Sequence, residues 1–360
     1  MISDKRIPIN IITGFLGAGK TTLLNHWVKS PSMKDCVVLI NEFGSVGLDH
    51  ELVQKVDNQV ILLESGCICC TLQSSLVQAL TDLFVKALKK EIPQFNRILI
   101  ETTGLADPGS LLTLINYDSF IEQRFRFDGT VTVVDAVNIR EQLKNQYEAV
   151  KQIALADIII VSKCDLVDGD ELDAITEVIR KLNKSAGVHP ALNGNLDPAI
   201  LNEIGPYNSG IAKDPKQISA WLSAESSNLG VASSFKPLQK SPAHTSGIGV
   251  MRKQPITVHS DIDTFSMEFD KPLNSDNLID ALEAVQMQFG DSLLRMKGIV
   301  CLKDNDQPVI VHGVYGQIYP LSYMDEWPEG KSSSKIVFIV RATVSKQIEL
   351  LFRDILLNEY

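Results

Sequence analysis

A loop between residues 14 and 22 carries the residue types that bind phosphate. It reads Gly-Phe-Leu-Gly-Ala-Gly-Lys-Thr-Thr, and Gly14, Gly19, Lys20 and Thr21 match the pattern G-x-x-x-x-G-K-[ST]. Glycines let the backbone turn so that successive N–H groups point into one concavity, and a following helix adds its positive end. Lys20 is expected to reach the β- and γ-phosphates, and Thr21 to bind Mg²⁺ through its hydroxyl. The loop therefore predicts a nucleoside triphosphate site rather than an ordinary glycine-rich turn.

A second group of candidate residues follows the apolar run at residues 98–100. The run ends in Glu101-Thr102-Thr103-Gly104. An acidic residue at the tip of a buried strand serves Mg²⁺, directly or through water, in nucleotide-hydrolysing P-loop proteins. Gly104 would let the backbone approach the γ-phosphate. An ordinary strand-terminal glutamate with a glycine turn is the alternative, and the phosphate loop favours the catalytic interpretation.

A third group indicates which base is bound. Residues 158–161 form an apolar run that ends in Ser162-Lys163-Cys164-Asp165, similar to the guanine-reading motif N-K-x-D with serine in place of asparagine. A carboxylate accepts two hydrogen bonds from the N1–H and the exocyclic amine of guanine, whereas adenine offers no such pair. The lysine stem packs on the base. The motif predicts GTP rather than ATP. Because Ser162 replaces the asparagine of the motif, the sequence does not show how this loop is supported.

Three thiols lie within four residues, in Cys67-Ile68-Cys69-Cys70. In a cytosolic protein such a cluster indicates metal or redox chemistry more often than a disulfide framework. Thiolates bind Zn²⁺ and similar metals, and this cluster supplies two or three ligands, so another must come from elsewhere. Glu42, directly after a neighbouring apolar run, is our candidate. We predict a transition-metal site; a redox role, or thiols without a function, are the alternatives.

Other chemistry-bearing residues are expected to be structural. Asp135, at the end of an apolar run, is either another strand-tip carboxylate near the site or a helix N-cap, and we favour the N-cap. Core, strand or surface positions rather than ligand positions are expected for Cys36, Cys164, Cys301, His26, His50 and His312.

Short apolar runs alternate with helical patterns through the first half of the chain. This alternation predicts an α/β fold with an open, mainly parallel sheet. Strands are expected at 7–12, 37–40, 60–63, 98–100, 131–134 and 158–161, and helices at about 21–29, 73–90 and 108–116, the last with Asp107 as N-cap. Ligands of such sheets bind beyond the carboxyl ends of the strands, where all these motifs lie.

The pattern changes in the second half, which predicts a second domain. We expect a P-loop domain at 1–224, with short helices in 193–224, and a linker rich in Ser, Gly, Pro and Lys at 225–255. A smaller α+β domain is expected at 256–360, because several strands follow one another there. Its strands are expected at 256–269, 293–303, 308–313, 316–321 and 336–343, and its helices at 275–289 and 345–356.

Composition narrows the functional classes. The net charge of −10 argues against broad nucleic-acid binding, which needs a basic face. No apolar run approaches the ~20 residues of a membrane span, so we expect no membrane insertion. The N-terminus lacks the apolar core of a signal peptide, and a cytoplasmic location is expected.

The order of these motifs resembles that of the CobW family of metallochaperone P-loop GTPases. The matching segments are the loop at 14–22, Asn-Glu-Phe-Gly at 41–44, Gly-Cys-Ile-Cys-Cys at 66–70, Glu-Thr-Thr-Gly-Leu-Ala-Asp-Pro at 101–108 and Ser-Lys-Cys-Asp at 162–165. The bacterial zinc-binding members are the most similar, and the urease and hydrogenase nickel-insertion GTPases are related. Residues 256–357 resemble the family's C-terminal domain.

The resemblance implies GTP hydrolysis coupled to the binding or delivery of a metal, commonly zinc and in some members cobalt, to a client metalloprotein. It implies GTP, GDP and Mg²⁺ as ligands and a slow intrinsic rate. A regulatory GTPase with a redox-sensing cysteine cluster, or a metal buffer that needs no hydrolysis, are the alternatives. By motif match, the phosphate and Mg²⁺ role is assigned to Gly17, Ala18, Gly19, Lys20, Thr21 and Thr22, the guanine role to Lys163 and Asp165, and the metal role to Glu42, Cys67, Cys69 and Cys70.

Overall fold

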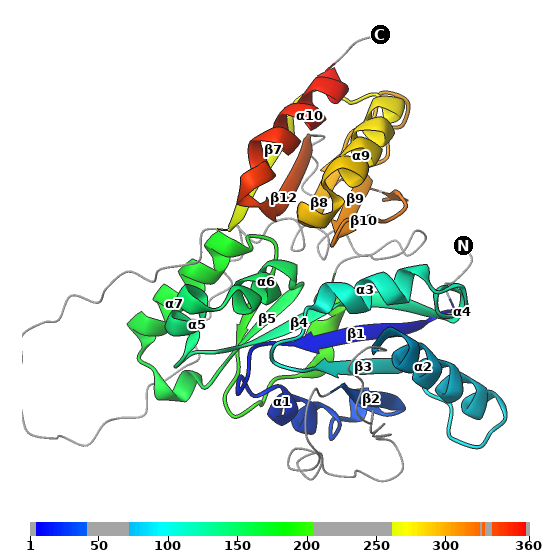
Figure 1. The fold of residues 1–360 in the computed structure, drawn as a ribbon, viewed down its shortest axis with the longest axis vertical. Coiled ribbons are helices and arrows are strands. Elements are labelled where there is room, and N and C mark those ends of the chain that lie inside the picture. Colours follow the sequence, from blue (N-terminus) through cyan, green and yellow to red (C-terminus); the bar gives the residue numbers. More distant parts are fainter. Residues whose placement is uncertain (1–4, 42–71, 205–260, 325, 328–332, 358–360) are drawn as a thin grey trace, which may run out of the picture.

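The computed structural model describes residues 5–41, 72–204, 261–324, 326–327 and 333–357. In this part of the chain a parallel sheet with helices on its faces is followed by a smaller antiparallel sheet with two helices on one face (Figure 1). The expected fold class is confirmed. The expected boundaries at 224 and 255 lie outside the described residues and stay predictions.

The first sheet has the strand order β2-β3-β1-β4-β5-β6, and every neighbouring pair is parallel. Its central strands are largely buried on both faces, which explains why apolar residues predominate in them. The strands are β1 (Ile7–Thr13), β2 (Cys36–Asn41), β3 (Arg97–Thr102), β4 (Phe125–Asp135), β5 (Ile158–Ser162) and β6 (Gly187–Pro190). All carboxyl ends therefore meet at one edge of this sheet.

The helices of the first domain connect these strands across both faces of the sheet. They are α1 (Lys20–Trp27), α2 (Leu72–Leu88), α3 (Pro108–Tyr117), α4 (Ser119–Arg124), α5 (Ile139–Asn145), α6 (Tyr147–Leu155) and α7 (Gly169–Leu182). Asp107 is the N-cap of α3, as the sequence predicts, and its side chain accepts a hydrogen bond from the N–H of Gly109 at 3.0 Å.

The second sheet has the order β10-β9-β8-β12-β7, with β11 paired to β9, and its pairs are antiparallel. Its strands are β7 (Ile262–Phe269), β8 (Leu293–Val300), β9 (Val309–Val314), β10 (Gln317–Ile318), β11 (Ser322–Tyr323) and β12 (Ser334–Arg341). The helices α9 (Ser275–Phe289) and α10 (Ser345–Leu357) pack on one face, as Figure 1 shows. Leu294, Val314 and Ile339 point to the other face and join the core of the first domain.

Three segments differ from the sequence-based expectation. β4 begins at Phe125 rather than near 131, because the buried Asp128 is paired with Arg97 and Arg126 and the strand can continue through it. β6 was not predicted, since its sequence Gly-Val-His-Pro has no apolar run. Where a strand was expected at 316–321, β10 ends at Ile318, two residues before a proline that cannot donate to a ladder.

Three expected segments fall wholly or partly outside the described residues, among them the first five residues of the strand expected at 256–269. The expected strand at 60–63 lies among residues that are not described. Of the short helices expected in 193–224, the described part contains one 3₁₀ turn, Pro198–Glu203.

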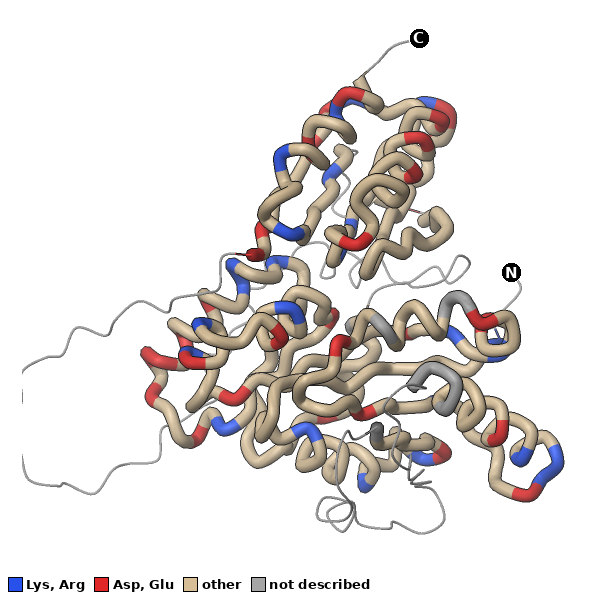
Figure 2. Tube along the Cα trace, in the orientation of Figure 1, with Lys and Arg blue, Asp and Glu red and all other residues tan. Residues whose placement is uncertain are grey.

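Charged residues of both signs are intermixed over the described helices of the two domains (Figure 2). Figure 2 shows no continuous basic stripe in the described part, such as nucleic-acid-binding proteins carry. The absence of nucleic-acid binding stays a prediction. Among the described residues, no helix combines the length and the apolar character needed to cross a membrane.

His312 on β9 provides a pH-dependent contribution to stability. Its ring is buried and stacks on Tyr319 with centroids 4.5 Å apart, near the charges of Arg295, Lys297 and Asp157. Burial first, and then the positive charge of Arg295, lowers the pKa of His312 from 6.5 to about 3. The unfolded chain therefore takes up a proton below pH 6.5 that the folded chain excludes, and stability falls between pH 6.5 and 3.

We expect His312→Phe to lose less stability on acidification than the unsubstituted protein. One excluded proton accounts for about 2 kcal/mol between pH 7 and pH 5. Urea unfolding at the two pH values measures both changes. Equal changes in the two proteins would show that His312 does not contribute to the pH dependence.

Candidate nucleotide site

The glycines of the loop at 14–20 have backbone conformations that few other residues adopt. Gly14, Gly17 and Gly19 have φ angles of 138°, 72° and 94°, and a Cβ at Gly14 would collide with the carbonyl oxygen of Val133. The α1 helix begins at Lys20, as the motif predicts. The Lys20 ammonium donates to the carbonyl of Gly14 at 3.0 Å, so this side chain lies over the loop.

Thr21 and Glu101 are 80 positions apart in sequence but meet at the edge of the sheet. The Thr21 hydroxyl donates to Glu101 Oε1 at 2.8 Å. Glu101 is buried on β3, beside Ile12 of β1. A hydroxyl and a carboxylate are hard oxygen donors of the kind that Mg²⁺ prefers, so the donor set fits the ion that the motifs imply.

The loop after β3 packs directly on the phosphate loop. A Cβ at Gly104 would collide with the backbone of Leu16, so only glycine allows this approach. Gln152 of α6 is buried and donates from Nε2 to the carbonyls of Gly104 at 3.1 Å and Ala106 at 3.2 Å. The Gly104 segment is thereby held against the phosphate loop from the α6 side.

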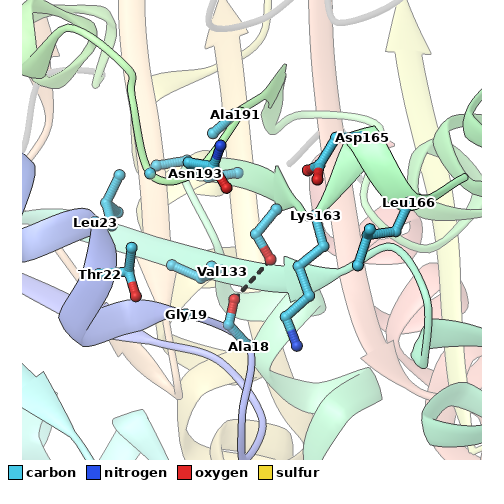
Figure 3. Close-up of a pocket in the computed structure, with 13 residues that line it drawn as sticks. Ala18, Gly19, Thr22, Leu23, Val133, Lys163, Asp165, Leu166, Ala191 and Asn193 are labelled. Carbon is cyan, nitrogen blue, oxygen red and sulfur yellow. Dashed lines mark hydrogen bonds between the residues drawn. The ribbon is translucent and has the colours of Figure 1, made fainter.

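Ser162 connects the guanine motif to the phosphate loop. Its hydroxyl lies 2.6 Å from the Ala18 carbonyl, the contact drawn as a dashed line in Figure 3, and 3.1 Å from the Val134 carbonyl. The serine therefore supplies the support between the two loops that the sequence left open. Lys163 follows with a φ of 56°, and a 3₁₀ turn begins at Cys164.

The prediction that Asp135 is a helix N-cap is wrong, and its alternative, a strand-tip carboxylate near the site, is closer to the structure. The α5 helix begins at Ile139, after Asn138, so Asp135 caps the turn before the helix through the N–H of Val137 at 2.9 Å. Its Oδ2 accepts from Lys163 at 2.7 Å. Burial alone would raise the pKa of Asp135, but the hydrogen bonds from Lys163, Asn138 and Val137 lower it below its ordinary value.

A pocket of about 200 Å³ lies beside these loops (Figure 3). It brings together the end of the phosphate loop, the guanine motif and the loop after β6. Its lining consists of Ala18, Gly19, Thr22, Leu23, Val133, Ile160, Ser162, Lys163, Asp165, Leu166, Ala191, Asn193 and Gly194.

Asn193 and Gly194 were not singled out from the sequence. Both adopt positive φ angles, 50° and 74°, and a Cβ at Gly194 would lie 3.0 Å from the Thr22 carbonyl. Figure 3 shows that Asn193 and Asp165 border the same pocket from different loops. The Asn-Gly pair is a turn signal that could have located this loop, had β6 been recognised before it.

The four candidate ligands of a transition metal, Glu42, Cys67, Cys69 and Cys70, lie outside the described residues. The chain leaves the described part at Asn41, which pairs with Thr102 next to Glu101. The described residues contain no group of three or more His, Cys, Asp or Glu side chains placed to hold a metal.

The isolated cysteines Cys36, Cys164 and Cys301 lie in environments that favour the protonated thiol. Cys36 is buried on β2, and burial raises the pKa of its thiol to about 12. Burial also raises the pKa of Cys164 and Cys301. A raised pKa opposes the thiolate form that binds metals. His26 is exposed, His312 is a buried strand residue, and His50 is not described.

Two family models match the chain. Residues 8–190 match the nucleotide-binding domain described as CobW/HypB/UreG. Residues 262–356 match the C-terminal domain described as that of the cobalamin synthesis protein cobW.

Similar proteins and structures carry names that concern zinc. The zinc chaperone YjiA of Escherichia coli (strain K12) is 30% identical over 92% of this chain and 93% of its own length. The zinc-regulated GTPase metalloprotein activator 1 of Schizosaccharomyces pombe is 35% identical over 53% of this chain and 47% of its own length. The crystal structure of Zn(II)-bound YjiA GTPase from E. coli has a TM-score of 0.66 at 25% identity, over 97% of this chain and 99% of that one.

Proposed function

Because this chain belongs to the CobW/HypB/UreG family of nucleotide-binding proteins, we propose that it is a GTP-hydrolysing metallochaperone. Its cargo is a transition metal held by Glu42, Cys67, Cys69 and Cys70, and a client metalloprotein receives that metal. Zinc is the first candidate, because the relatives of known function are named for zinc. Cobalt is a second cargo to be tested on the same ligands.

In this proposal, GTP binds across the described pocket and the phosphate loop. The pocket volume lies below the roughly 300–1,000 Å³ of sites for drug-sized ligands, which suits the base rather than a whole nucleotide. Asp165 accepts from the guanine edge, the Lys163 stem packs on the base, and Ser162 supports the loop. The phosphates contact Gly14, Gly17, Ala18, Gly19, Lys20, Thr22 and Gly104.

Thr21 and Glu101 hold Mg²⁺ in the proposed site, and this ion neutralises charge on the phosphates when bound. Lys20 turns from the Gly14 carbonyl to the β- and γ-phosphates. No glutamine or arginine is assigned to orient the attacking water, and slow hydrolysis is expected for such a GTPase without a partner.

One observation carries the link between the metal and GTP. The strand β2 ends at Asn41, which pairs with Thr102, while the preceding Ile40 pairs with Glu101. Glu42 is therefore the next residue after a strand whose end lies beside the Mg²⁺-binding strand. A change in this strand end on GTP binding reaches the first metal ligand through one peptide bond.

Coupling of this kind has a thermodynamic consequence. GTP changes the metal affinity only if the contacts of Glu42 or of the cysteines differ between the GTP and GDP states. The metal then changes the GTP affinity by the same factor.

We expect the affinity for Zn²⁺ to differ between the GTP-analogue and GDP states by about five- to 150-fold, the usual range of coupling between two sites. Titration of anaerobic protein with Zn²⁺, in competition with a chromophoric chelator, measures the affinity in each state. Equal affinities in the two states would remove the coupling.

Two variants separate this proposal from its alternatives. Cys69→Ser with Cys70→Ser is expected to abolish tight Zn²⁺ binding, while Cys301→Ser, an isolated cysteine, is expected to retain it. If the double variant keeps its zinc affinity but loses a response to oxidants, the cluster is a redox sensor. If Lys20→Ala still delivers zinc to the metal-free client protein, the chain is a metal buffer whose function does not require GTP hydrolysis.

A further inference from the structure

Tyr315 is a residue of the second domain that lies against the first. It occupies the turn between β9 and β10, where Tyr315 and Gly316 have φ angles of 52° and 74°. Its backbone N–H donates to the Leu294 carbonyl at 2.9 Å. Its ring packs on Gly109 at the start of α3, where the ring fills the space that a side chain at 109 would take. The turn thus holds the ring against the first domain.

The Tyr315 hydroxyl joins an ion pair of the first domain. It donates to Asp107 Oδ2 at 3.1 Å, and the Lys151 ammonium binds the same oxygen at 2.5 Å. The ammonium also lies 4.5 Å from the centroid of the Tyr315 ring, within the range of a cation–π contact. The side chain of Lys151 is largely buried, which strengthens both interactions.

Asp107 is the last residue of the loop between β3 and α3, which begins at Thr103. While its Oδ2 binds Lys151 and Tyr315, its Oδ1 caps α3. At the other end of the loop, Gly104 packs on the backbone of Leu16 in the phosphate loop. The loop is therefore held at one end by the phosphate loop and at the other by a side chain of the second domain.

Tyr315 remains a donor over the physiological range. Burial, together with the negative charge of Asp107, raises the pKa of Tyr315 to about 12. The hydroxyl is therefore protonated at neutral pH and donates to a carboxylate oxygen, a charge-assisted hydrogen bond.

We propose that Tyr315 is a positioning residue for GTP hydrolysis: through Asp107 and Lys151 it fixes the 103–107 loop, and with it Gly104, against the γ-phosphate position. This inference rests on the proposed GTP site. It also makes the C-terminal domain a regulator of the GTPase, because any partner that moves the β9–β10 turn changes the support of the loop.

We expect Tyr315→Phe, which removes only the hydroxyl, to lower kcat for GTP hydrolysis by about five- to tenfold, the rate equivalent of about one lost hydrogen bond. The affinity for a non-hydrolysable GTP analogue falls with it, whereas the affinity for GDP, which has no γ-phosphate, is unchanged. Single-turnover hydrolysis and nucleotide titration measure these three quantities in zinc-free, full-length protein.

Tyr323→Phe is the matched control, because Tyr323 is an exposed tyrosine of the same domain on β11. It is expected to leave kcat and both affinities unchanged. Lys151→Met is expected to lower kcat and the affinity for the GTP analogue as Tyr315→Phe does, whereas Lys151→Arg is expected to keep most of the activity. The double variant Tyr315→Phe/Lys151→Met is expected to lose little more activity than either single variant, because the two side chains act as one unit.

Three outcomes would overturn the proposal: unchanged kcat in Tyr315→Phe, an equal loss of GTP and GDP affinity, or a loss of activity that only follows the unfolded fraction in a parallel thermal scan. The test does not depend on zinc. A failure of the zinc coupling therefore leaves it intact, and absence of GTP binding by the unsubstituted protein would refute the proposed function itself.

Discussion

Asp165→Asn is expected to lower the affinity for GTP by about a thousandfold or more and to make xanthosine triphosphate the preferred nucleotide. A site built to hydrogen-bond a substrate group rejects an analogue that lacks this group by roughly 10⁴–10⁵. In the proposed site, the Asp165 carboxylate would accept from the N1–H and the amine of guanine. An asparagine amide turns one of these acceptors into a donor, which repels the guanine amine and suits the carbonyl that xanthine carries instead.

The local structure makes this a clean substitution. Asp165 is an exposed residue in the 3₁₀ turn Cys164–Leu166, and it borders the pocket opposite Asn193 (Figure 3). An amide of the same size fits the same space. The neighbouring contacts of Ser162 with Ala18, and of Lys163 with Asp135, do not involve it.

Competition of each nucleotide against a fluorescent GTP analogue measures the change. Asp170→Asn makes the same chemical change at an exposed position in the first turn of α7, outside the pocket lining, and is expected to leave both affinities unchanged. If Asp165→Asn binds GTP as tightly as the unsubstituted protein does, Asp165 does not read the base.

Local chemistry explains why the placement of the nucleotide motifs could be predicted. Each motif follows one apolar strand, and the parallel sheet brings all strand ends to one edge, so Thr21 and Glu101 meet without any further information. The order of the motifs also predicted the family, because glycines and a lysine at this spacing rarely occur outside phosphate-binding loops.

The contacts between the two domains could not be predicted, because they join residues far apart in sequence. Nothing near Asp107 indicates that Tyr315, 208 positions away, binds its carboxylate. In the same way, Arg295 and Lys297 interrupt an apolar strand, where the alternating pattern alone would point them to solvent or to a substrate. Their partner Asp157 lies 138 positions from Arg295 in the first domain. Sequence spacing cannot pair such groups, because only the docked domains bring them together.

Asp157→Ala is expected to destabilise the protein by about 3–5 kcal/mol, the usual cost of removing one partner of a buried ion pair. Asp157 is buried before β5, where it binds Arg295 and lies 3.6 Å from the Lys297 ammonium. Without the carboxylate, two cations face each other in the interface between the domains. Burial first, and then the charge of Arg295, already lowers the pKa of Lys297 well below its ordinary value.

The compensated variant Asp157→Asn/Arg295→Met/Lys297→Met tests whether charge is the cause. Its asparagine can still accept from the N–H of Thr130, which binds Asp157 Oδ2 at 2.9 Å, and its methionines fill the space of the basic side chains. Replacement of a buried charge group by apolar side chains is often neutral, so this variant is expected to regain most of the lost stability.

Glu177→Ala, which breaks the exposed Glu177–Lys181 pair of α7, is the control and is expected to leave the free energy of unfolding almost unchanged. Urea unfolding followed by tryptophan fluorescence ranks the variants. If Asp157→Ala unfolds at the same urea concentration as Glu177→Ala, the buried charges do not hold the domains together. If the compensated variant is no more stable than Asp157→Ala, lost packing rather than unpaired charge is the cause.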